Sequence, residues 1–324
     1  MKDFDKILET LSDGKFHSGK ALAQELNCSR SSVWKKIKSI KSQYDIEIFA
    51  VTGRGYKLQT AIEVLKKRHI LEFLSKPSLE SLVSCNVVTS TSSTNSLAMN
   101  SSPELNKGIA WFAEHQISGK GRRGREWYSP FGQNIYFSLA WNFNIALAEI
   151  SSLSIAAGAT LAALLHENGI REHELKWPND LIFNNSKLAG ILIEAQGETN
   201  GPTTVAIGVG LNLDMSFVPK EYINQSFVGL KQMNCEKSRN EIAGRLLNSM
   251  IVMCQNFSLH GLAPFIEKWN HFDKLLGKDV QVISPSKTEK GMYLGLTSNG
   301  GLKLRVNNRE KIFYAGELSL RTLK

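Results

Sequence analysis

A short segment rich in glycine and basic residues is the most chemically suggestive part of the sequence. Residues 119–125 read GKGRRGR, which places four cations among three glycines. Glycines let backbone N–H groups approach an anion closely, and the cations stabilise it. The letters also match the GxGxxG dinucleotide fingerprint, but no helix is expected to start after them. We therefore expect an anion-binding loop; a solvated basic loop or a nucleic-acid contact is the alternative.

A second candidate region joins a rigid turn to an apolar strand. Residues 176–190 read KWPNDLIFNNSKLAG, and the apolar run KLAGILIE starts at Lys187. An ammonium group at this point could offset negative charge that develops during a reaction. The alternatives are a solvated lysine at a strand edge and an ordinary Pro-Asn-Asp turn at 178–180.

These two regions, together with SSTN at 92–95 and WFAEHQISGKGRRGREWYSPF at 111–131, resemble biotin–protein ligases. The resemblance is to the bifunctional bacterial repressor type in particular. The chain departs from the family's usual GRGRRG loop at Lys120. Lysine keeps the charge of arginine but lacks its planar, bidentate fork.

The resemblance implies roles for individual residues. Hydroxyl and amide groups suit the neutral urea of biotin, because it needs both donors and acceptors. The implied biotin-binding residues are Ser93, Thr94, Asn95, Gln116, Lys120, Gly121, Arg122 and Lys187. The implied ATP- or adenylate-binding residues are Arg122, Arg123, Arg125, Trp127, Asn179, Asp180 and Asn212. Lys187 and Arg122 would be catalytic, and Asp180 is a candidate contact for the Mg²⁺ expected with ATP.

Each of these residues also has an ordinary structural interpretation. Residues 92–95 could simply cap a helix, and Gln116 could be a polar surface residue. Trp127 could belong to the core rather than cover an adenine ring. No Cys/His cluster has metal-ligand spacing, so apart from Asp180 the sequence offers no metal ligand.

The first 60 residues are expected to form a winged helix-turn-helix. Apolar residues at helical spacing predict helices near 4–12, from about 18, and from about 30 to 41. Ser29 is a good N-cap for the third helix, and a short polar turn precedes it. Two β-like runs, 47–51 and 56–58, flank Gly53-Arg54-Gly55 and predict a hairpin, or wing.

The third helix carries an exposed basic face. Residues 1–60 hold 11 Lys and Arg against 7 Asp and Glu, so this segment contributes +4 of the formal net charge of +9. Arginine and serine near the start of such a helix can reach base edges, while lysines suit phosphates. The predicted DNA-binding residues, in a helix-turn-helix at about 19–38, are Arg30, Ser31, Ser32, Lys35 and Lys36. A solvated basic helix in a protein–protein module is the alternative.

The remaining residues predict a mixed central region and an all-β tail. A connecting helix is expected over 61–75, further helices over 150–166 and 240–257, and strands over 109–114, 134–141, 181–183, 188–193 and 204–211. Short alternating runs after Gly277 predict a small β-barrel, which the resemblance makes SH3-like. The expected fold is α+β, with a winged helix at 1–62, a class II synthetase-like catalytic domain with a mixed sheet at 63–272 and the barrel at 273–324.

Composition and the distribution of apolar residues indicate a globular protein rather than a membrane or secreted one. The chain has 324 residues, 42% hydrophobic and 21% charged, as in ordinary globular proteins. The N-terminus lacks the apolar region of a signal peptide, and no uninterrupted apolar run reaches about 18 residues. Only four cysteines are present, widely spaced, which suits a reducing compartment. We expect a cytoplasmic protein without a membrane span.

The sequence thus predicts an ATP-dependent biotin–protein ligase that is also a biotin-responsive transcriptional repressor. The resemblance implies formation of biotinoyl-AMP, transfer of biotin to a lysine of the carrier protein of acetyl-CoA carboxylase, and biotinoyl-AMP as co-repressor. It also implies operator DNA as a partner and a homodimer on that DNA. A lipoate-type ligase and a non-catalytic, ligand-sensing repressor are the alternatives.

Overall fold

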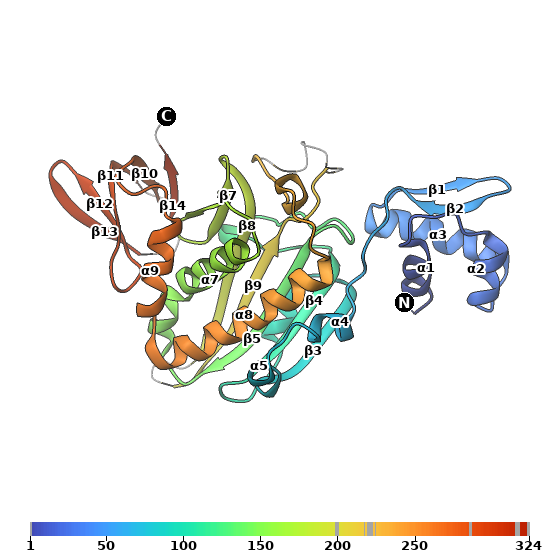
Figure 1. Cartoon of the computed structure of the whole chain (residues 1–324), viewed down its shortest axis with the longest axis horizontal. Helices are drawn as coiled ribbons and strands as arrows, with labels where there is room; N and C mark the ends of the chain where they lie inside the picture. Colours follow the sequence, from blue (N-terminus) through green and yellow to red (C-terminus); the bar gives the residue numbers. More distant parts are fainter. Residues whose placement is uncertain are drawn as a thin grey trace.

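The computed structural model of the chain describes residues 2–197, 201–216, 218, 223, 225–284, 287–314 and 318–322. An N-terminal helical unit and a C-terminal sheet lie at opposite ends of a central mixed sheet (Figure 1). The predicted α+β fold class is confirmed.

Residues 2–58 form the predicted winged helix. Its elements are α1 (Lys2–Leu11), α2 (Gly19–Glu25), α3 (Arg30–Tyr44), β1 (Ile48–Val51) and β2 (Gly55–Leu58). Ser18 and Ser29 cap α2 and α3, since each side chain accepts a hydrogen bond from the backbone N–H three residues further on. The apolar stripe of α3 is buried against α1 and α2. The strands β1 and β2 pair in antiparallel fashion and form the wing.

The central domain is built on a seven-stranded sheet. In spatial order its strands are β3 (Leu82–Thr91), β4 (Gly108–Gln116), β5 (Ile135–Phe143), β9 (Thr203–Leu211), β8 (Ser186–Gly197), β7 (Asp180–Phe183) and β6 (Glu174–Lys176). Only β3 and β4 run parallel, and the other neighbours are antiparallel. The predicted mixed sheet is therefore present, although β3 and β6 were not expected.

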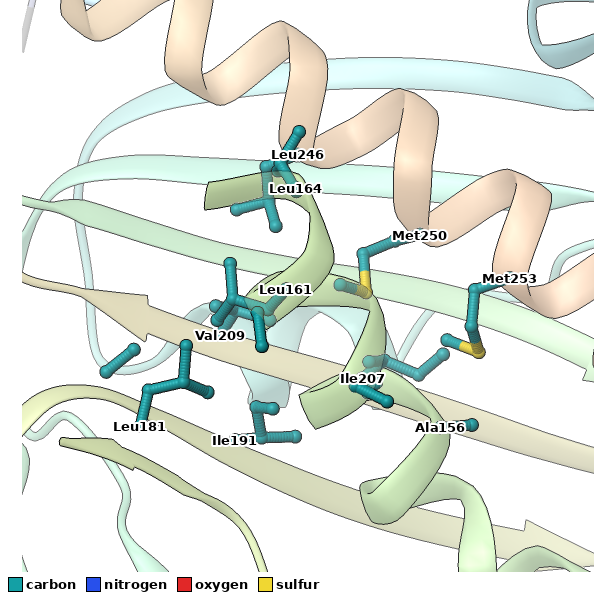
Figure 2. Close-up of a cluster of buried hydrophobic side chains, with 14 of the residues drawn as sticks. Ala156, Leu161, Leu164, Leu181, Ile191, Ile207, Val209, Leu246, Met250 and Met253 are labelled. Atoms are coloured by element: carbon teal, nitrogen blue, oxygen red, sulfur yellow. The ribbon is translucent and has the colours of Figure 1, made fainter. Parts of the chain in front are cut away.

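The two faces of this sheet are covered differently. One face is covered by α7 (Leu153–Glu167) and α8 (Arg239–His260), with α9 (Ala263–Phe272) packed on α7. Figure 2 shows Leu161 of α7 beside Val209 of β9, and Met250 of α8 in the same buried cluster as Ile207 of β9. Alternate residues of a strand point to opposite faces. Small residues such as Ala140 and Ala206 therefore face the other side, where they contact α6 (Thr94–Met99).

The segment that links the winged helix to the sheet is less helical than predicted. Instead of a helix over 61–75, the structure has α4 (Lys67–Leu71) and α5 (Lys76–Glu80). The reason lies in the start of α8, because the Glu63 carboxylate accepts hydrogen bonds from the backbone N–H groups of Arg239 and Asn240. Asn240 in turn accepts from the backbone N–H of Lys66. These contacts hold residues 63–66 in a non-helical conformation.

The C-terminal residues form an antiparallel sheet, as predicted for an all-β tail. Its order is β13 (Arg309–Phe313), β12 (Leu302–Val306), β11 (Thr288–Leu296), β10 (Asp279–Ile283) and β14 (Ser319–Thr322). Within the described part of the tail the end strands β13 and β14 are not paired with each other. The strand β14 was not predicted. The domain boundaries proposed at 62/63 and 272/273 fall between the regular elements on either side.

The described part of the chain also contains three short 3-10 turns. The turns are η1 (Arg122–Gly124), η2 (Leu147–Ser152) and η4 (Leu230–Met233). Within the described residues, Leu147–Glu167 is long and apolar enough for a membrane span by length and composition, although the sequence suggested no such stretch. Sixty-one per cent of its most apolar window is buried inside the protein. Such burial is what the core helix of a globular domain shows.

Candidate active site

A cavity of about 550 Å³ opens on the face of the sheet that carries α6. Its walls come from the start of α6, from the glycine–arginine segment and from the facing strands β8 and β9. Asp45, at the end of α3, also lines it. The cavity therefore lies where the winged helix meets the catalytic sheet.

One end of the cavity is a buried set of neutral polar groups. Thr94 donates from its backbone N–H and its hydroxyl to Gln116 Oε1, at 2.9 and 3.1 Å. Gln116 Nε2 donates to Ser129 Oγ at 2.9 Å. Ser138 Oγ lies 2.8 Å from Thr94 Oγ1 and 2.6 Å from Asn95 Oδ1. Mutual hydrogen bonds fix these side chains in place, so their remaining donors and acceptors face the cavity in a defined arrangement.

The predicted motif at 92–95 therefore does more than start a helix. Ser93 is the N-cap residue of α6, but its side chain makes no cap hydrogen bond. It is buried and lines the cavity, as do Thr94, Asn95 and Gln116. The structural alternative of a simple helix cap is thus not what is observed.

The floor of the cavity is made of glycines beneath a tryptophan. A Cβ atom added at Gly210 would lie 2.4 Å from Trp127 Cε2, and one at Gly190 would lie 2.8 Å from Trp127 Cζ3. The indole therefore rests directly on the backbone of β8 and β9, which only glycine permits. Trp127 lines the cavity rather than belonging to the hydrophobic core. Its Nε1 atom is buried and has no hydrogen-bond partner within the described structure.

The glycine–arginine segment folds as a tight hairpin over the cavity. Gly121 N–H donates to the carbonyl of Arg125 at 2.7 Å, and Trp127 N–H donates to the carbonyl of Gly119 at 2.8 Å. At the tip, Arg123 adopts a left-handed conformation with φ 60°. Glycines at 121 and 124 flank this turn. Three of its four cations, Lys120, Arg122 and Arg125, line the cavity, whereas Arg123 does not.

Arg122 and Arg123 consequently have different positions. Arg122 is half-buried, and its Nη1 donates to Asn179 Oδ1 at 3.1 Å. Its Nη2 donates to the carbonyl of Leu318 at 3.5 Å, so it joins the loop to the C-terminal sheet. Burial lowers the pKa of the Arg122 guanidinium, and the charge of Asp180 opposes this effect. Arg123 is exposed and is not among the cavity-lining residues.

A cluster of charge occupies the other end of the cavity. Lys187 Nζ lies 2.8 Å from Asp180 Oδ1 and 5.2 Å from the centre of a Trp127 ring, and only 13% of its side chain is exposed. Burial lowers the pKa of the neighbouring Lys176, and Asp180 opposes this shift. Lys187 is thus not a solvated strand-edge lysine. It is a largely buried lysine that lines the cavity.

Two other predicted residues lie outside the cavity lining. Asp180 stands behind Lys187 as its ion-pair partner. Asn212 is buried, and its Nδ2 donates to the carbonyl of Lys187 at 3.1 Å, so it supports the strand that carries the lysine. Arg125 and Asn179 do line the cavity.

Sequence reasoning missed several residues of the site. Ser129, Ser138 and Glu194 complete its hydrogen-bond network, and Gly190, Gly208 and Gly210 form its floor. The alternation of glycine with apolar residues over 205–211 was a usable signal, because glycine in a strand marks a close approach. The serines and Glu194 carried no such signal.

The predicted DNA-binding residues occupy one helix of the winged domain but do not all face outward. Arg30, Ser31 and Lys35 are exposed, while Ser32 is half-buried. Lys36 Nζ lies 3.2 Å from Asp3 Oδ2 on α1. Trp34, which was not predicted, is 53% exposed on the same face.

The winged helix packs directly on the segment that follows the loop. Phe131 is buried in the winged-helix core, 5.4 Å from Tyr44 between ring centroids. Tyr44 also meets the edge of His115, which precedes Gln116 on β4. Burial lowers the pKa of His115, and the nearby Asp45 opposes this. The end of α3 therefore contacts both the segment that follows the loop and the strand β4.

Comparison with known proteins places these features in one family. The profile of the biotin/lipoate A/B protein ligase family matches residues 85–212, and that of a helix-turn-helix domain matches residues 5–57. The structure is similar to that of the biotin protein ligase from Aquifex aeolicus in complex with biotin and ATP. The TM-score is 0.62 and the identity 25%, over 75% of this chain and 100% of that one.

Two full-length relatives carry both regions. The chain is 34% identical to the bifunctional ligase/repressor BirA of Escherichia coli, over 98% of this chain and 97% of the relative. It is 28% identical to the corresponding protein of Bacillus subtilis, over 94% of each. The chain therefore belongs to the biotin/lipoate protein ligase family, among its bifunctional ligase/repressors.

Proposed function

We propose that this protein is an ATP-dependent biotin–protein ligase that also represses transcription in response to biotin. One observation carries the ligase half: one cavity combines a polar end of buried hydroxyl and amide groups with a cationic end that holds the largely buried Lys187. The polar end suits the urea of biotin, and the cationic end suits a carboxylate and phosphates. In the first half-reaction the biotin carboxylate attacks the α-phosphate of ATP, and pyrophosphate leaves.

The residues of the two ends would act differently in this step. Ser93, Thr94, Asn95 and Gln116 would hold the urea and so place the carboxylate. Lys187 would stabilise the negative charge that develops as the carboxylate oxygen attacks phosphorus. Its pairing with Asp180 keeps the ammonium in position beforehand.

The loop and the tryptophan would hold the nucleotide. Trp127 offers a flat indole face on a glycine floor and a buried, unpaired Nε1 donor, which fits a purine ring. Arg122, Arg125 and Asn179 line the same cavity and suit phosphate or ribose oxygens.

A magnesium ion would be held mainly by the substrate. No group of three or more His, Cys, Asp or Glu residues that could bind a metal occurs within the described ranges. Magnesium in ATP sites is commonly bound by one or two carboxylates together with phosphates. Asp180 is the carboxylate that could contribute, and Mg²⁺ would supply charge neutralisation of the phosphates.

In the second half-reaction an acceptor lysine amine attacks the mixed anhydride, forming an amide and releasing AMP. The proposed acceptor is the carrier domain of acetyl-CoA carboxylase, since the relative from Mycobacterium tuberculosis is named a biotin–[acetyl-CoA-carboxylase] ligase. That relative is 31% identical over 72% of this chain and 87% of its own length. A cytoplasmic location is part of the proposal.

We expect the purified chain to transfer biotin to a biotin-carboxyl-carrier domain in the presence of ATP and Mg²⁺. The test supplies radiolabelled ATP with either biotin or lipoate and then adds the acceptor. Labelled adenylate with biotin alone, followed by acceptor modification, supports the proposal. Adenylate formed from lipoate points to a lipoate-type ligase. Ligand binding without any adenylate points to a non-catalytic sensor.

The repressor half rests on the exposed basic face of α3. Arg30, Ser31 and Lys35 are accessible there, as base and phosphate contacts require. Lys36, paired with Asp3, would contribute less. A single helix-turn-helix reads a short site, and a homodimer would read two sites in register.

Biotin and ATP together should strengthen operator binding by about tenfold or more. Ligand binding that orders the loop lowers the ordering cost that remains for dimerisation. Gel-shift titrations on the protein's own upstream regions, with and without biotin plus ATP, measure the effect. Lys187→Ala is the matched control, because it retains α3 and should fail to make adenylate. Equal affinity in both conditions would remove the co-repressor role and leave the ligase proposal standing.

A further inference from the structure

One carboxylate connects the loop to the polar end of the cavity. Glu194 lies on β8, where it pairs in register with Ala206 of β9 on the face that α6 covers. Its Oε1 accepts from Lys120 Nζ at 3.1 Å, and its Oε2 accepts from Asn95 Nδ2 at 2.9 Å. We infer that Glu194 is a positioning residue that sets the orientation of the Asn95 amide and anchors the loop over it. This inference rests on the proposed ligase function.

The orientation of Asn95 follows from its two neighbours. A carboxylate can only accept hydrogen bonds, so the atom facing Glu194 must be the Nδ2 donor. On the other side, Asn95 Oδ1 lies 2.6 Å from the hydroxyl of Ser138. These two contacts therefore fix the orientation of the Asn95 amide, with Nδ2 toward Glu194 and Oδ1 toward Ser138. The amide presents an oxygen acceptor, with a free lone pair, toward a ring N–H such as those of a urea.

The other oxygen of Glu194 holds the loop. Lys120 belongs to the hairpin at 119–127, and its partner Glu194 is 74 residues away along the chain. The pair is partly exposed, so it contributes little to the free energy of unfolding. The ion pair instead positions the loop, because it connects Lys120 to the strand β8, which forms part of the cavity floor.

The same geometry explains why lysine can stand at position 120. An ammonium group is a compact donor that needs one carboxylate oxygen, whereas a guanidinium fork can take both. With Lys120 on Oε1, Oε2 stays available to Asn95. Lys120 and Glu194 thus form a matched pair in which a single carboxylate serves two partners.

The test begins with Glu194→Gln, which keeps the shape but replaces one acceptor by an NH₂ group. That group faces either Lys120 or Asn95, and each is a donor. We expect the Kd for biotin, measured by calorimetry without ATP, to rise by about tenfold or more, the scale of losing one charged hydrogen bond. Release of preformed adenylate should quicken by a similar factor. The single-turnover adenylation rate at saturating biotin should stay within about threefold of the native rate.

Lys120→Met separates the two roles of the carboxylate. It removes the loop anchor but leaves Glu194 on Asn95, so adenylate release should quicken while the biotin Kd rises less than in Glu194→Gln. The double variant should release adenylate no faster than Glu194→Gln alone, because both act through one contact. Glu104→Gln is the control, since Glu104 forms an exposed ion pair with Lys107 remote from the cavity.

Each outcome has a definite meaning. An unchanged biotin Kd in Glu194→Gln, or release rates that multiply in the double variant, overturns the inference. If Glu194→Gln does not fold, native release by Lys120→Met overturns it instead. If the native protein binds no biotin, the proposed function itself fails, and that result is distinct from a native protein that binds and a variant that binds equally well.

Discussion

Replacing Lys187 by alanine should lower the single-turnover rate of biotin adenylation by roughly 10²-fold or more. That is the scale of removing one preorganised electrostatic group from a water-poor site. Lys187 qualifies because its ammonium is largely buried, paired with Asp180 and placed beside Trp127. The effect should appear in the rate even at saturating biotin, where weaker binding of the biotin carboxylate no longer contributes.

Two further variants show whether the loss belongs to the ammonium itself. Lys187→Ala leaves the Asp180 carboxylate with one fewer cation, which could disturb the site. Lys187→Ala combined with Asp180→Asn removes that excess charge, and we expect the rate to stay low. A recovered rate would assign the loss to Asp180 and contradict a direct role for Lys187. Lys107→Ala, at an exposed ion pair, should leave adenylation unchanged.

Replacing Arg122 by glycine should let the adenylate escape about ten to a hundred times faster. Arg122 spans three parts of the site, since it lies in the loop and donates to Asn179 and to the carbonyl of Leu318. Loss of one hydrogen bond from a charged donor costs about 1.5–3 kcal/mol, which corresponds to this range. Radiolabelled adenylate is formed on the protein first, and a filter-binding assay then measures how fast the label leaves the protein.

Arg123→Gly offers a close comparison within the same loop. It also removes an arginine, but Arg123 is exposed, and its φ of 60° is one that glycine adopts readily. We expect release to change by less than about threefold. A native release rate for Arg122→Gly, or equal effects of the two substitutions, would show that Arg122 does not hold the loop closed.

The fold could be predicted wherever a local pattern was strong. Serine caps and an apolar stripe gave the helices of the winged domain, and apolar runs gave five of the seven central strands. The strand Leu82–Thr91 was missed because it lies at the edge of the sheet and contains no continuous apolar run. The strands β6 and β14 are short; β6 pairs with the adjacent β7, whereas β14 pairs with the more distant β10.

The residues of the candidate site likewise fall into those that a local motif predicted and those that no local motif predicted. Contiguous motifs led to Ser93, Thr94, Asn95 and to Lys187, all of which line the cavity. Glu194 could not be found from sequence, because its meeting with Asn95 depends on where α6 crosses the sheet. Asn212 lies outside the cavity lining, and its amide supports the backbone of Lys187.

The burial of Phe131 among winged-helix residues bears on how this architecture can evolve. Its ring is covered by Tyr44, so a lineage that lost the N-terminal domain would expose an aromatic side chain a few residues from the ligand loop. It would also lose the cavity wall that Asp45 provides. Loss of the regulatory module is therefore not a neutral truncation. Descendants that keep only the catalytic function would need compensating substitutions around residues 128–132. Conversely, a protein that gains an N-terminal winged helix by gene fusion would need an aromatic residue there to pack against it.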